Sequence, residues 1–155
     1  MVELPQDELP AGYREYARAI ASSHFATPGF PDLQSEMMSG LQGRPGERQI
    51  AGMAAVTGNS VDEPRLEAII VIRGKDEADG PIFGEFIYAV RWVEGPGFLR
   101  LLVGLENGLP RLYGTWVGLI EPGRTIRQYV DAVRRAYGLR ASVPQTTRPG
   151  RFSLL

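Results

Sequence analysis

The spacing of apolar residues divides the chain into a helical start, a central region of strands and a final helix. Near the N-terminus, apolar side chains recur every three or four residues, which is the period of one helix face. These positions are Leu9, Tyr13, Tyr16, Ala17, Ile20 and His24. Asp7 is a suitable N-cap for this helix, and the segment Thr27–Pro31 predicts its end. The spacing of Leu33, Met37 and Leu41 then predicts a second, shorter helix.

From residue 49 to residue 120 the pattern changes to runs of β-branched, aromatic and other apolar residues, separated by turn residues. The runs predict five strands: Gln49–Thr57, Arg65–Arg73, Ile82–Val93, Phe98–Glu106 and Arg111–Ile120. The links between them are short, whereas parallel crossovers need about a dozen residues or more. We therefore predict a five-stranded antiparallel meander.

The last helix has the clearest pattern. Thr125 is the predicted N-cap, and Gly138 followed by Leu139 is typical of a Schellman ending. The apolar stripe between them consists of Ile126, Tyr129, Val130, Val133 and Tyr137. We thus predict one α+β domain over residues 1–139, with helices in 1–45, the sheet in 49–120 and this amphipathic helix in 125–138 packed on the sheet. Residues 140–155 form a basic C-terminal arm or tail.

Two short turns between the last three strands predict their register. If EGPG and ENGLP are the turns, apolar or glycine residues line up in every row across the three strands. The predicted rows are Trp92–Leu99–Gly118, Val90–Leu101–Trp116, Tyr88–Val103–Gly114 and Phe86–Leu105–Leu112. Both tryptophans then lie on one buried face, with the C-terminal helix docked on it. Gly114 and Gly118 either make room for that helix or line a ligand cavity, to which Tyr88, Trp92 and Trp116 would contribute.

The opposite sheet face is too apolar for a face in free contact with water. Its members in the predicted register include Ile87, Arg91, Arg100, Leu102, Tyr113 and Val117. Either the N-terminal helices or a second copy of the chain covers this face. Arg91 beside Arg100 is a like-charge pair that the carboxylates Glu85 and Glu106 of an antiparallel copy would relieve. We therefore expect a homodimer that uses these residues as its interface.

Composition and charge narrow the chemistry. The chain has no cysteine and a single histidine, which excludes thiol catalysis and the usual multi-histidine metal sites, so we expect no metal and no cofactor. Residues 1–123 carry 10 basic and 17 acidic side chains, and residues 124–155 carry 7 arginines and one aspartate, which gives −7 + 6 = −1 overall. This balance argues against nucleic acid as the partner. With no apolar run of transmembrane length and no signal-peptide pattern, we expect a cytoplasmic protein that binds no membrane.

The sequence contains few groups suited to catalysis. His24 is the weak candidate for an acid–base residue, because histidine titrates near neutral pH. Its place on the apolar helix face instead predicts a structural role. We expect a non-enzymatic interaction or adaptor module that binds an unidentified protein partner through a sheet face. The alternative is a small-molecule-binding or hydrolytic domain with a pocket between the sheet and the C-terminal helix.

Overall fold

A computed structural model describes residues 1–25, 56 and 58–140 of the chain. The strands are β1 (Val2–Leu4), β2 (Arg65–Arg73), β3 (Phe83–Trp92), β4 (Gly95–Glu106) and β5 (Leu109–Leu119). The helices are the short 3-10 helix η1 (Gln6–Glu8), α1 (Tyr13–Ser22) and α4 (Ile126–Ala136). The predicted second helix near Leu33 and nearly all of the predicted strand 49–57 lie outside the described residues, as does the arm beyond Arg140.

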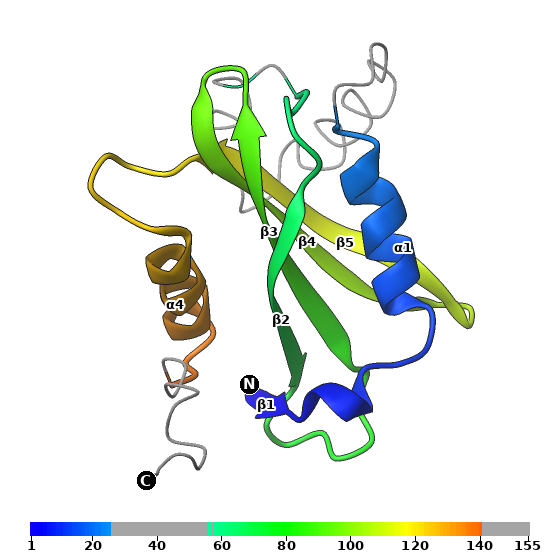
Figure 1. Cartoon of the computed structure of the whole chain (residues 1–155). Helices are drawn as coiled ribbons and strands as arrows, with labels where there is room; N and C mark the ends of the chain where they lie inside the picture. Colours follow the sequence, from blue (N-terminus) through cyan, green and yellow to red (C-terminus); the bar gives the residue numbers. More distant parts are fainter. Residues whose placement is uncertain (26–55, 57, 141–155) are drawn as a thin grey trace, which may run out of the picture.

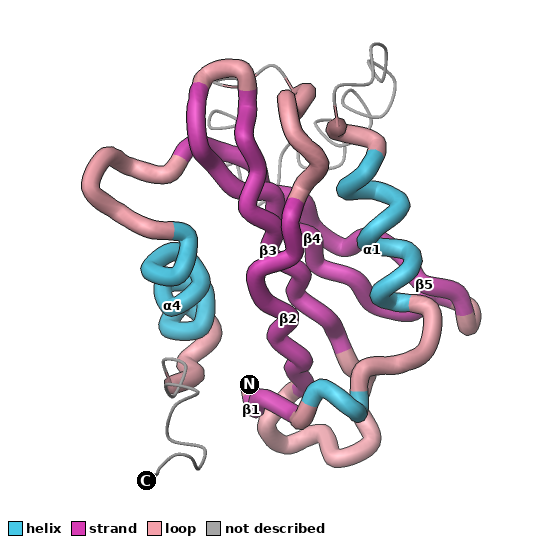
Figure 2. The backbone as a smooth tube through the Cα atoms, viewed as in Figure 1, coloured by secondary structure: helices cyan, strands magenta, loops and turns pink. Residues whose placement is uncertain are grey.

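The five strands form one antiparallel sheet in the order β1-β2-β3-β4-β5 (Figure 2). This confirms the α+β class with a five-stranded antiparallel sheet. The first strand differs from the prediction, because β1 at the N-terminus pairs with β2 through Val2↔Arg73 and Leu4↔Val71. Three residues are too few for the sequence pattern to show a strand. β1 and β5 are therefore the two edges of the sheet that the described residues form.

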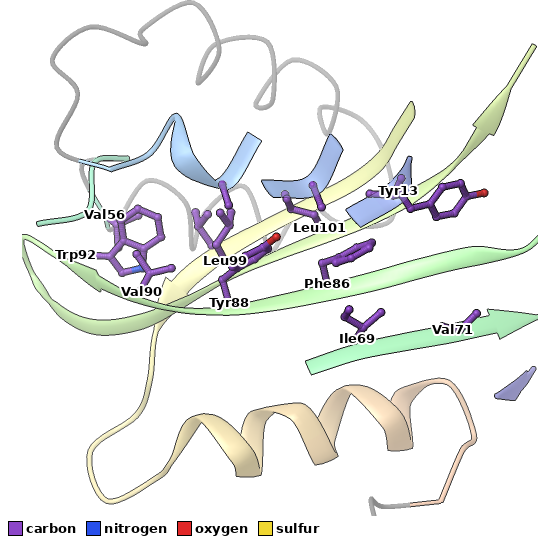
Figure 3. Packing of buried hydrophobic residues seen from close by; sticks show 14 residues of the cluster. Tyr13, Val56, Ile69, Val71, Phe86, Tyr88, Val90, Trp92, Leu99 and Leu101 are labelled. Carbon is purple, nitrogen blue, oxygen red and sulfur yellow. The ribbon is translucent and has the colours of Figure 1, made fainter. Parts of the chain in front are cut away.

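The two long helices lie on opposite sides of the sheet (Figure 1). We call the two sides the α1 face and the α4 face. On the α1 face, Tyr13 and Ala17 of α1 pack in one buried cluster with sheet residues that include Phe86, Tyr88, Trp92, Leu99 and Leu101 (Figure 3). On the α4 face, Val130 and Val133 of α4 pack against Ile70, Ile72 and Ile87. Burial on both faces explains the almost continuous apolar run of β2.

The predicted caps are correct for α4 and wrong for α1. The Thr125 hydroxyl accepts a hydrogen bond from the Gln128 backbone N–H at 3.1 Å, and the Gln128 side chain accepts one from the Thr125 N–H at 2.9 Å. Gly138 has a φ of 76° and ends the helix as predicted. Asp7 does not cap α1, which begins at Tyr13 after Gly12. Pro10 is the reason, because a proline disfavours helical geometry in the residue before it, here the extended Leu9.

The turn between β3 and β4 is tighter than expected. Trp92 pairs with Gly95, where the predicted partner was Leu99, so Val93 and Glu94 alone form the turn. Gly95 has a φ of 142°, which glycine adopts without steric cost, and this permits the short turn. Because the register differs by an even number of residues, each side chain of β3 and β4 still lies on its predicted face.

A β-bulge in β5 overturns the predicted position of Trp116. Val103 pairs with Leu112, but Leu102 pairs with Gly114, so Tyr113 is an extra residue in the strand. One extra residue moves every later side chain to the other face. Trp116 and Gly118 therefore share a face with Arg100, and Thr115 and Val117 lie on the α1 face instead.

The position of α4 differs from the predicted one. The C-terminal helix does not dock on the face of Trp92 but on the opposite one, where Ile87 is fully buried. α1 already occupies the Trp92 side. The sheet thus has a helix on each face.

Candidate functional site

Among the described strands, β5 carries the largest number of exposed large apolar side chains. β5 pairs with β4 on one side and with no described strand on the other. Leu109, Tyr113 and Leu119 of this strand are 67%, 44% and 41% exposed. The strand follows a two-residue turn at Asn107 and Gly108, which both have positive φ. An edge strand with unpaired backbone groups is a template for pairing with another chain. We name the outer side of β5 the β5 edge.

The residues predicted as an interface do not form one surface. Ile87 is buried under α4, and Leu102 is partly buried there. Val117 is buried on the opposite, α1 face. Arg91 is exposed and its strand partner is Pro96 rather than Arg100, which removes the expected like-charge pair. Tyr113 is 44% exposed, and its ring lies on the α4 face, where it meets the ring of Phe83 of β3 edge to face at 5.3 Å.

Arg100 belongs to a buried polar cluster on the α4 face. Its guanidinium forms an ion pair with Glu85 of β3, whose side chain has no exposed surface. The Tyr137 hydroxyl at the end of α4 donates a hydrogen bond to the same carboxylate at 2.6 Å. The guanidinium also lies 4.1 Å from the ring centroid of Trp116, which is a cation–π arrangement. The cluster therefore links β3, β4, β5 and α4.

The electrostatics of this cluster suit a structural role. Burial raises the pKa of Glu85, while the positive charge of Arg100 and the hydrogen bond from Tyr137 oppose that rise. Burial also raises the pKa of the Tyr137 hydroxyl, which therefore stays protonated and donates to the carboxylate. Each group is satisfied by another member, as a stable buried ion pair requires. The cluster fixes α4 to the sheet.

The three predicted ligand-binding residues lie in different surroundings. Trp92 is 1% exposed, and its indole N–H donates to the Gly118 carbonyl at 3.1 Å, so it belongs to the core. Trp116 lies on the other face beneath Arg100. Tyr88 lines a cavity between α1 and the sheet, together with Arg14 and Arg18. The i,i+4 spacing of these two arginines is visible in the sequence, but nothing in the sequence places Tyr88 beside them.

A hollow also lies between the sheet and α4, where the alternative prediction placed a pocket. Its volume is about 290 Å³. Phe98 of β4 and Tyr129 of α4 line it, and their rings stack on each other with centroids 4.0 Å apart. Arg124 and Glu121 from the β5–α4 loop complete its rim. Tyr88, Trp92 and Trp116 are not among its lining residues.

His24 is a buried residue whose surroundings suit a neutral ring. It is 3% exposed, and its Nδ1 atom lies 2.8 Å from the Gly58 carbonyl oxygen, which makes Nδ1 the protonated nitrogen. Its ring meets Trp92 edge to face at 5.9 Å. Burial lowers the pKa of His24, and the hydrogen bond to Gly58 partly opposes that change. Its backbone carbonyl accepts a hydrogen bond from the buried Ser60 hydroxyl at 2.8 Å.

Within residues 1–25, 56 and 58–140, no three histidine, aspartate or glutamate side chains gather as metal ligands would. In the same part of the chain, no helix has the length and hydropathy needed to span a bilayer.

Comparison of the whole chain with known proteins found no matching family model, no similar curated protein and no similar solved structure.

Proposed function

We propose that this chain is a non-enzymatic interaction module and that two copies pair along the β5 edge into a homodimer. The observation that carries the proposal is the side of β5 that pairs with no described strand, on an edge strand of 11 residues with three exposed apolar side chains. Edge strands in monomeric proteins are usually short, charged or covered. A second copy would pair with this side of β5 and continue the antiparallel sheet across both chains.

The composition of β5 supports a second copy of the chain as its pairing partner. From Gly114 to Leu119 the strand carries no charge and no proline, so an antiparallel copy would bring no like charges together and would lack no backbone donor. A two-fold axis beside Trp116 would set Gly114 of each chain opposite Gly118 of the other. Within each chain, these two glycines accommodate the indole of Trp116 over Gly114 and the ring of Phe98 over Gly118. Pro110 and Arg111 would lie outside the paired segment and limit its length.

The proposal keeps the expected homodimer but moves its interface from a sheet face to a sheet edge. The faces are occupied by α1 and α4, whereas the edge is open within the described residues. A dimer of this kind leaves α1, α4 and the β2 side of each chain free for a protein partner, the second part of the adaptor prediction. An isologous contact of this type also closes on itself and does not form fibres.

Light scattering coupled to size-exclusion chromatography tests the dimer. The wild-type chain should have twice the 17.0 kDa mass of one copy at micromolar concentration. The variant Tyr113→Lys/Leu119→Lys places two charges on the edge strand β5 and should be a folded monomer. The control Val93→Lys changes a 64% exposed apolar residue in the β3–β4 turn, away from that edge, and should remain a dimer.

Two results would refute this proposal. One is a single-copy mass for the wild-type chain at every concentration measured. The other is a dimer that persists in Tyr113→Lys/Leu119→Lys while the far-ultraviolet circular dichroism is unchanged.

A further inference from the structure

A cavity between α1 and the start of β2 brings together three groups suited to an anion. Arg14 and Arg18 lie four residues apart on α1, so their side chains project from one side of the helix. Tyr88 of β3 reaches the cavity from the sheet, on the side that α1 covers (Figure 3). The cavity has a volume of about 300 Å³, the lower end of the range for small-molecule sites.

The hydroxyl of Tyr88 is the unusual feature of this cavity. The residue is 4% exposed, yet its hydroxyl has no hydrogen-bond partner among the described residues. The other tyrosines with defined contacts are satisfied: Tyr13 donates to the Ile82 carbonyl at 2.7 Å, and Tyr113 donates to the Leu105 carbonyl at 2.8 Å. The hydroxyl oxygen is not one of the buried side-chain atoms that lack a partner in the described part of the chain, so it is accessible from the cavity that Tyr88 lines. The hydroxyl of Tyr88 therefore has an unused donor in the cavity.

The charges around this donor favour an acceptor with a negative charge. Burial raises the pKa of Tyr88 to about 12, and the positive charges of Arg18 and Arg14 act in the opposite direction. The hydroxyl therefore keeps its proton at neutral pH. Neither arginine forms an ion pair with a described carboxylate, whereas Arg65, Arg100, Arg111 and Arg134 all do.

The remaining lining residues restrict the class of anion. Glu63 contributes one negative charge to the rim, so the cavity carries two positive charges and one negative, which suits a single negative charge better than two. Leu66, which is 37% exposed, forms an apolar wall beside the arginines. An arginine guanidinium matches the geometry of a carboxylate through two parallel hydrogen bonds.

We propose that this cavity binds a small organic monocarboxylate, with the carboxylate held by Arg14, Arg18 and the Tyr88 hydroxyl and the apolar part of the ligand on Leu66. Ser22, one further turn along α1 from Arg18, also lines the cavity. The assignment is independent of dimer formation, because the cavity contains no residue of β5.

Titration calorimetry with benzoate as the probe tests the assignment on the full chain. Benzoate should bind saturably at millimolar concentration. Benzamide, its neutral counterpart, and acetate, which lacks the apolar ring, should both bind at least tenfold more weakly. Inorganic phosphate tests whether the cavity prefers a carboxylate to a phosphate anion, and it should also bind more weakly than benzoate.

Substitutions then locate the site. Tyr88→Phe keeps the ring and removes the hydroxyl, and it should weaken benzoate binding about tenfold, as expected for one hydrogen bond to a charged group. Arg14→Gln/Arg18→Gln should abolish measurable binding. The control Arg127→Gln/Arg135→Gln removes the same charge from exposed positions on α4 and should leave the affinity unchanged.

Several outcomes would overturn the proposal. They are the absence of saturable benzoate binding, equal affinity for benzoate and benzamide, tighter binding of phosphate than of benzoate, and equal losses in the α1 and α4 arginine variants. If Tyr88→Phe were unfolded by circular dichroism, the comparison of the four probes on the wild-type chain would still decide between these outcomes.

Discussion

Replacement of Arg100 by leucine should strongly destabilise the fold. The Glu85 carboxylate has no exposed surface, and Arg100 is its one cationic partner in the cluster. Removing one member of a buried ion pair typically costs about 3–5 kcal/mol, because a charge is left buried without compensation. Loss of the cation–π contact with Trp116 adds about 0.5–2 kcal/mol. Since small domains are stable by about 5–15 kcal/mol, Arg100→Leu should remain folded only marginally.

The cost of Arg100→Leu should depend on pH in a defined direction. Burial already raises the pKa of Glu85 in the folded protein, and loss of the opposing charge of Arg100 raises it further. A carboxyl group whose pKa is higher in the folded state than in the unfolded state favours folding at low pH, and this stability is lost as pH rises through the folded pKa. The destabilisation should therefore be largest at pH 7 and shrink as the pH falls toward the unfolded value of 4.5.

Urea unfolding followed by circular dichroism at pH 7 and pH 5 measures both effects. The control Glu85→Gln/Arg100→Leu removes both charges and keeps an acceptor for the Tyr137 hydroxyl, so it should recover most of the lost stability. The reasoning is refuted if Arg100→Leu costs less than about 1 kcal/mol, or if the double variant is as unstable as the sum of the two single variants.

Three further predictions concern the core and its titrating histidine. Val133→Asp places a charge at a 2% exposed position of the α4 face and should lower the thermal unfolding midpoint sharply; an unchanged midpoint would show that α4 does not stabilise the sheet. Trp92→Ala should cost about 3–5 kcal/mol, and Trp116→Ala should cost less because Trp116 is only partly buried; equal costs in urea unfolding would contradict the β5 bulge. The pKa of His24 is lowered on folding, so the wild-type chain should lose stability as pH falls below the unfolded value of 6.5; His24→Gln should lack this loss, and identical stability–pH curves would contradict it.

Periodicity predicted the four long strands and the C-terminal helix of the described residues, because each of them has its own local pattern. β2 has the bounds predicted for it, and the caps of α4 follow from a threonine and a glycine at fixed positions. The extra residue at Tyr113 has no such pattern, since a bulge depends on how two strands fit together. One bulge was enough to place Trp116 on the wrong face and with it the predicted aromatic rows.

The positions of the charged residues could have identified the correct register of β3 and β4. The predicted register put Arg91 beside Arg100, which is unfavourable. The observed register, shifted by an even number of residues, places Arg100 diagonally from Glu85 and relieves that repulsion within one chain. Apolar alternation cannot distinguish the two registers because both keep the same faces. A search for the register that pairs opposite charges would have found the buried cluster.

The candidate ligand site was only partly predictable, for a different reason. Tyr88 was expected to bind a ligand with Trp92 and Trp116, but its neighbours in the cavity are Arg14 and Arg18, which are about 70 positions away in the chain. Their proximity depends on α1 crossing the face that carries Tyr88, and the amphipathic pattern of α1 does not specify which part of the sheet it crosses.

The two proposals place dimer formation and ligand binding at separate parts of the sheet. The dimer contact is the outer side of β5, whereas the cavity is formed by α1, β3 and the chain leading into β2, near the opposite edge. Because no residue belongs to both, neither event should change the affinity of the other. Benzoate titration of the wild-type dimer should therefore give one site per chain with a single affinity, and Tyr113→Lys/Leu119→Lys should bind benzoate as the wild type does. An affinity that changed with the number of copies would mean that the cavity is completed or closed by the second chain.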